Sequence, residues 1–68
     1  MNDAQREDLI KGISLCFQQN YFAIELMELS QKFKEVNEYE LENAIDTMLR
    51  RKELIFDMDE KKYRLVLK

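Results

Sequence analysis

The chain has 68 residues, of which 46% are hydrophobic and 37% charged, and its formal net charge is −3. This length predicts one domain over residues 1–68, near the lower limit at which a hydrophobic core folds without disulfides or metals. With one cysteine and no histidine, the chain lacks an intramolecular disulfide, the common zinc sites, and the Ser-His-Asp and Cys-His catalytic arrangements. We therefore expect no enzymatic activity, no cofactor and no metal.

The sequence also argues against membrane association. No stretch approaches the roughly 18 apolar residues of a membrane-spanning helix. Residues 2–8 are polar and mixed in charge, unlike a secretory signal. We expect a soluble cytoplasmic protein whose small core leaves room for stabilisation by a partner, including a second copy in a homodimer.

The first part of the chain carries apolar residues at helical spacing, which predicts a helix over residues 3–17. Asn2 or Asp3 can cap its N-terminus. Gly12 lies inside this helix at a cost of about 1 kcal/mol relative to alanine, which indicates close packing of another element. The predicted buried face consists of Leu9, Ile10, Ile13, Cys16 and Phe17.

Residues 18–20 break this pattern, and two further helices follow a short extended segment at residues 21–24. The spacing of apolar residues predicts the second helix over residues 25–34. The third helix is predicted from the N-cap Asn37 to residue 52. The predicted buried positions of these two helices are Leu26, Leu29, Phe33, Leu41, Ala44, Ile45 and Met48.

The last fifteen residues change to the alternating pattern of strands. One set of apolar residues, Leu54, Phe56 and Met58, alternates with Ile55 and Asp57, and a second set, Tyr63, Leu65 and Leu67, alternates with Arg64, Val66 and Lys68. A polar connection of four residues, 59–62, separates the two runs. Two alternating runs around such a connection predict a β-hairpin.

The order of helix, short strand, helix, tight turn, helix and hairpin resembles the winged helix-turn-helix family, most specifically from Val36 to Leu67. Residues 49–55 look like the family's exit into the first wing strand, and residues 62–65 like the returning strand. Glu53 departs from the pattern, because the family usually carries glycine there. The family's buried third-helix positions are matched by Leu41, Ala44, Ile45 and Met48. The resemblance implies a mainly α fold with a C-terminal β-hairpin, that is, a winged helix of three helices plus a wing.

In that family the third helix usually reads the DNA major groove, so the outward face of the predicted third helix is the candidate binding surface. Asn43 and Arg50 have the chemistry to contact adenine and guanine. The three carboxylates on this face oppose the phosphates of DNA, which carries about one negative charge per 1.7 Å of duplex. The outward and flanking residues are Tyr39, Glu40, Glu42, Asn43, Asp46, Thr47 and Arg50.

Charge is divided unevenly along the chain. Residues 1–49 carry four basic and ten acidic side chains, whereas residues 50–68 carry seven basic and four acidic ones. The basic residues of the second part are a solvated edge or a contact surface for an anionic partner. They are Arg50, Arg51, Lys52, Lys61, Lys62, Arg64 and Lys68.

These patterns leave two functions open. The favoured one is a non-enzymatic regulatory module that binds another protein through the acidic face of the second and third helices. The alternative is a DNA-binding transcriptional regulator that uses the basic wing and the third helix, and that acts as a dimer. The carboxylates on the outward face favour the protein partner over double-stranded DNA.

Overall fold

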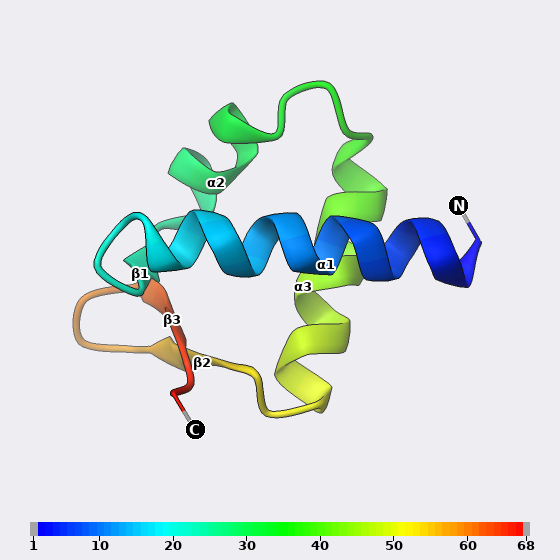
Figure 1. Ribbon diagram of the computed structural model, residues 1–68. Coiled ribbons are helices and arrows are strands. Elements are labelled where there is room, and N and C mark those ends of the chain that lie inside the picture. Colours follow the sequence, from blue (N-terminus) through cyan, green and yellow to red (C-terminus); the bar gives the residue numbers. More distant parts are fainter. Residues whose placement is uncertain (1, 68) are drawn as a thin grey trace.

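The computed structural model describes residues 2–67, which form three helices and a small three-stranded antiparallel sheet (Figure 1). The predicted order of three helices followed by a C-terminal hairpin is present. Within residues 2–67, no helix is long and apolar enough to cross a bilayer. The elements are α1 (Asp3–Gln18), β1 (Ala23–Ile24), α2 (Leu26–Lys32), α3 (Glu38–Arg50), β2 (Leu54–Asp57) and β3 (Lys62–Leu65).

Helix α1 begins where its capping residue predicts. The Asn2 side chain accepts from the Gln5 backbone N–H at 2.8 Å, and the Gln5 side chain accepts from the Asn2 N–H at 3.0 Å, a reciprocal capping box. Another element does pack at Gly12, as predicted, since Phe33 lies over it, but this packing does not require glycine. A Cβ there would lie 3.7 Å from Cε1 of Phe33, an ordinary van der Waals distance with room for a methyl group.

The turn after α1 differs from the predicted extended segment at residues 21–24, because only Ala23–Ile24 form a strand. Tyr21 and Phe22 adopt left-handed conformations, with φ of 59° and 65°. The Phe22 N–H donates to the Phe17 carbonyl at 2.7 Å and so folds the chain back sharply on the end of α1. Such a conformation costs about 1–2 kcal/mol per non-glycine residue, so aromatic residues do not predict it.

Helix α2 is shorter than predicted, covering residues 26–32 instead of 25–34. Leu29 is fully buried, as expected. The expected burial of Leu26 is wrong, because this side chain at the start of the helix is 39% exposed. Phe33 is half-buried and packs against the edge of the core.

Helix α3 is capped by Asn37, whose side chain accepts from the Tyr39 N–H at 2.8 Å. The helix ends at Arg50, two residues before the predicted end. Lys52 has a left-handed φ of 61°, its N–H donates to the Leu49 carbonyl, and the Glu53 N–H donates to the Met48 carbonyl. This pair of hydrogen bonds is a Schellman motif, in which glycine usually holds the left-handed position. The sequence therefore ends the helix without glycine, at a conformational cost borne by Lys52.

Replacing Lys52 with glycine is expected to stabilise the fold by about 1 kcal/mol, because glycine has no Cβ to oppose the left-handed conformation. Urea denaturation measures the change in the free energy of unfolding. Lys52→Ala is the matched control, since it removes the same charge but keeps the Cβ, and it should give no such gain. Equal stability of the glycine and alanine variants would contradict the assignment of strain to Lys52.

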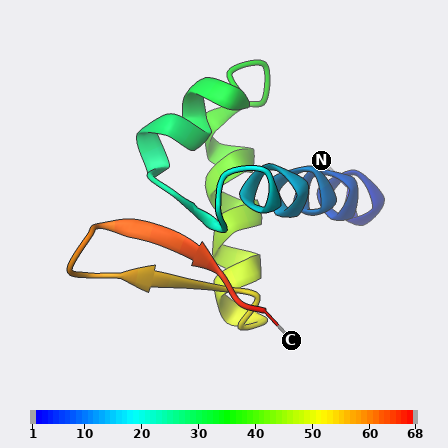
Figure 2. The same ribbon diagram turned by 60° about the vertical axis from the view of Figure 1, so that its left-hand side comes forward.

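The sheet has the strand order β1-β3-β2, with β3 in the centre. In β3, Tyr63 pairs with Ile24 of β1 on one side and with Phe56 of β2 on the other. The connection between β2 and β3 covers residues 58–61, one residue earlier than predicted. Figure 2 shows that this hairpin projects away from the C-terminal end of α3.

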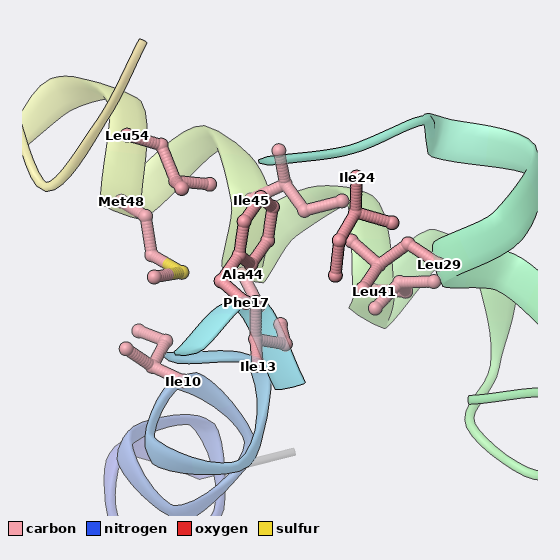
Figure 3. Packing of buried hydrophobic residues seen from close by; sticks show 10 residues of the cluster. All are labelled: Ile10, Ile13, Phe17, Ile24, Leu29, Leu41, Ala44, Ile45, Met48 and Leu54. Atoms are coloured by element: carbon pink, nitrogen blue, oxygen red, sulfur yellow. The ribbon is translucent and has the colours of Figure 1, made fainter. Parts of the chain in front are cut away.

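The core joins all three helices to the base of the sheet (Figure 3). Every member is at most 3% exposed, and no buried polar or charged residue accompanies them among residues 2–67. The predicted stripes of α1 and α3 supply most of it, with Leu9 and Cys16 half-buried at its edge. The core residues are Ile10, Ile13, Phe17, Ile24, Leu29, Leu41, Ala44, Ile45, Met48 and Leu54.

Candidate functional site

An open groove lies on the outward side of α3, between the first turn of α2 and the hairpin. Its volume is about 240 Å³, and three separate parts of the chain line it. Figure 2 shows why they meet: α2 and the hairpin both project from the same side of α3. The lining residues are Leu26 of α2, Glu42, Ile45, Asp46 and Leu49 of α3, and Tyr63 of β3.

The apolar part of the groove is continuous with the core beneath it. Ile45 is buried, and Leu49 and Tyr63 pack against the core, whereas Leu26 remains 39% exposed. The Tyr63 ring meets the Phe56 ring edge-on, with centroids 5.0 Å apart. Because Phe56 is itself 42% exposed, apolar surface extends from the groove onto the hairpin.

Two carboxylates on α3 give the groove its charge. Glu42 and Asp46 are four residues apart, which places them on the same side of the helix and about 6 Å apart along its axis. Both are exposed, and Asp46 Oδ2 lies 3.1 Å from Arg50 Nη2. Among the described residues, no basic side chain lines the groove itself, but the ion pair with Arg50 offsets the charge of Asp46, so the acidic character of the rim comes mainly from Glu42.

The structure divides the predicted partner-binding face of the third helix into separate surfaces. Only two of its members line the groove, namely Glu42 and Asp46. Two exposed members stand beside it, Tyr39 and Arg50. At 100° per residue the remaining, half-buried members turn toward other sides of α3. These are Glu40, Asn43 and Thr47, the last of which donates its hydroxyl to the Asn43 carbonyl.

The three arginines of the predicted basic set are each paired with carboxylates. Arg50 pairs with Asp46 within α3, and Arg51 with Glu7 of α1. Arg64 holds two hairpin carboxylates, Asp57 at 2.9 Å and Glu60 at 3.0 Å. The hydrogen bond from Arg51 lowers the pKa of Glu7, and that from Arg64 lowers the pKa of Asp57. Much of the predicted basic charge is therefore neutralised within the fold.

The lysines of the basic set are placed differently. Lys52 and Lys61 are exposed at two turns, and Lys62 is half-buried at the start of β3. Within residues 2–67 none of these three has a carboxylate at ion-pair distance. Lys68, the last member of the set, lies outside the described residues. The unpaired lysines of this set that the structure describes thus lie just after α3 and at the turn and start of the returning strand of the hairpin.

Stability is expected to depend on pH through Asp57, whose pKa in the folded chain is lowered mainly by Arg64 and further by the N–H groups of Glu60 and Asp59. A lowered folded pKa means that the stabilisation is fully present above the unfolded pKa of about 4 and is lost as the pH falls through the folded value. Asp57→Asn should be less stable than the native chain at neutral pH, and this difference should shrink as the pH falls through the folded pKa of Asp57. Thermal melts across this range measure the difference.

The control for this experiment is Asp59→Asn, which removes an exposed carboxylate of the same turn without touching Arg64. That variant should show no comparable convergence with pH. A stability deficit of Asp57→Asn that stays constant down to acid pH would contradict a role for the Arg64 ion pair.

The apolar lining of the groove was missed at the level of sequence. Helical spacing assigns Ile45 and Leu26 to the core, and alternation assigns Tyr63 only to a strand. Alternation places Tyr63 and Phe56 on the inner face of the hairpin. Because the hairpin extends beyond the body of the molecule, that inner face lies open near its tip (Figure 2).

The described residues hold no group of three or more side chains suited to metal binding. Cys16 is half-buried, and burial raises the pKa of its thiol, which disfavours the reactive thiolate. Asn20 Nδ2 donates to the Cys16 carbonyl at 2.7 Å, and this hydrogen bond holds the following turn against the end of α1.

The chain matches no protein-family model, and neither the curated proteins nor the solved structures include a significant match to it.

Proposed function

We propose that this chain is a small non-enzymatic regulatory module of the winged-helix type that acts in the cytoplasm by binding another protein. The contact surface is the groove on α3 with its acidic rim. The element order and the pairing of the short strand β1 with the hairpin support the winged-helix layout. No cofactor enters the proposed activity.

The observation that carries this proposal is the character of the outward side of α3, the side that would face DNA in the family that the sequence resembles. Glu42 and Asp46 border the groove there, and apolar side chains line it. A surface that combines apolar area with carboxylates repels a phosphate backbone but suits a protein with apolar and basic residues.

Double-stranded DNA is the alternative partner, and one observation favours it. Lys52, Lys61 and Lys62 have no carboxylate partner among the described residues, so they remain available for phosphates. Three lysines give one copy a weak contact, so this function would need a homodimer to double it.

Affinity capture with the immobilised chain tests the protein-binding proposal. Captured proteins are identified by mass spectrometry, purified, and titrated against the chain by calorimetry. Glu42→Lys/Asp46→Lys should weaken binding of the true partner by at least about tenfold, because it places positive charge where the partner's basic residues dock.

The matched control is Asp8→Lys/Glu35→Lys, which makes the same change in net charge at exposed positions away from the groove. Circular dichroism of both variants confirms that they fold. Equal weakening by the two double variants would mean that binding depends only on net charge. If neither variant weakened binding, the groove would not be the contact surface.

A further inference from the structure

We infer that the groove on α3 receives an amphipathic α-helix of the partner, which inserts apolar side chains and carries lysine or arginine along one edge. This inference rests on the proposed protein-binding function and specifies the chemistry of its partner.

The size of the groove favours side chains of a macromolecule over a small ligand. Its volume of about 240 Å³ is below the roughly 300–1,000 Å³ of typical pockets for small molecules and cofactors. Its apolar surface is lined by Leu26, Ile45, Leu49 and Tyr63, and continues through Phe56 along the hairpin. One or two large apolar side chains from an adjoining element fit such a surface.

The strand that borders the groove has no free backbone edge for an extended peptide. Tyr63 lies in the central strand β3, where Ile24 of β1 and Phe56 of β2 occupy the two neighbouring positions. An extended segment laid in the groove would find no strand to pair with, so its own backbone N–H and C=O groups would lose water without gaining partners. A helix satisfies these groups internally and exposes only side chains.

The carboxylates at the rim of the groove determine which charged residues the partner's helix carries. Glu42 and Asp46 are separated by one helical turn, and the same rise separates basic residues at i and i+4 of a helix laid alongside α3. Beyond Leu26, on the α2 side of the groove, the preceding residue Glu25 is exposed. Lys62 lies on the opposite face of the hairpin from Tyr63 because strand side chains alternate. Carboxylates therefore prevail around the apolar floor.

A titration of the isotope-labelled chain with synthetic peptides, followed by ¹H–¹⁵N NMR, tests this inference. The probes are helical peptides of about 16 residues, long enough to form helix in isolation. Each carries leucine at i, i+3, i+4 and i+7 with lysine at i and i+4 positions of one edge, and the panel varies the register of the lysines. We expect saturable shifts centred on Leu26, Ile45, Leu49 and Tyr63.

Three comparisons sharpen the test. A peptide of the same composition with two central prolines cannot form the helix and should not bind. A peptide with glutamate in place of lysine should bind at least about tenfold more weakly. The Glu42→Lys/Asp46→Lys chain should lose affinity for the lysine peptide by a similar factor, while Asp8→Lys/Glu35→Lys should retain it.

Several outcomes would overturn the inference: no saturable binding by any helical peptide of the panel, equal binding by the proline peptide, or shifts centred on Lys61 and Lys62. These failures differ from failure of the proposed function. If no helical peptide binds, but a captured protein still depends on Glu42 and Asp46, the groove binds protein and only the helical form of the partner is wrong.

Discussion

Replacing Leu41 with aspartate is expected to leave the chain unfolded at room temperature. Leu41 is 2% exposed and packs beside Leu29 in the core, among apolar side chains that offer an aspartate no partner (Figure 3). Burying an unpaired charge, together with the loss of leucine packing, costs upwards of about 4 kcal/mol. A chain of this length has a total stability of only about 3–10 kcal/mol. Far-ultraviolet circular dichroism and a thermal melt measure the loss of helix and of cooperativity.

Leu15→Asp is the matched control for this substitution, because Leu15 lies on a helix but is 56% exposed. It should retain the helical signal and a cooperative melt. If Leu41→Asp also kept both, the packing of α3 in the core would be contradicted.

Truncating Phe17 to alanine is expected to destabilise the fold by about 3–5 kcal/mol. Its ring is fully buried, and its carbonyl accepts from Asn20 and Phe22, which lead the chain through the left-handed turn into β1. Loss of the ring opens a cavity at the point where α1, the turn and the sheet converge. The midpoint of urea denaturation should fall steeply, with little helix remaining at moderate denaturant.

Phe17→Leu separates the loss of packing from other effects at this position. It keeps most of the apolar volume and should cost less than about 1.5 kcal/mol. Similar costs for alanine and leucine would mean that the cavity does not determine the effect, and that the account of this part of the core is wrong.

The helices could be predicted because their apolar residues repeat with the helical period and their capping residues are of the right type. Asn2 and Asn37 both cap helices in the structure, and the stripes of α1 and α3 are buried. The hairpin followed from alternation, within one residue at its turn. These features depend on local chemistry, which the sequence displays directly.

The features that the sequence does not predict are strained backbone conformations and the exposure of apolar side chains, and both depend on the tertiary fold. Four residues adopt left-handed conformations although none of them is glycine or asparagine, so the sequence does not predict these turns. They are Tyr21, Phe22, Lys52 and Lys61. At Phe22 and Lys52, backbone hydrogen bonds to the carbonyls of Phe17 and Leu49 hold the chain in this conformation. The exposure of Leu26 arises in the same way, because helical spacing specifies a face but not whether another element covers it.

The sequence indicates the acidic side chains of the candidate site but not the shape of the groove. Spacing assigns Glu40, Glu42 and Asp46 to the outward face of α3, but only Glu42 and Asp46 border the groove, and Glu40 is half-buried on another side. The groove itself joins Leu26 to Tyr63, which are 37 positions apart in the chain, and no local pattern relates them. The pairing of the three arginines with carboxylates likewise depends on the fold. It reduces the positive charge that these side chains could offer to DNA.

The most direct test of protein rather than DNA recognition is the fluorescence anisotropy of a labelled random-sequence duplex, titrated with the chain at low and then at physiological salt. We expect a flat titration at both salt concentrations, up to about 100 µM of protein, the weak end of non-specific DNA binding. Binding that weakens steeply with salt, and that disappears in Lys61→Gln/Lys62→Gln, would contradict this account and identify the hairpin as a DNA contact.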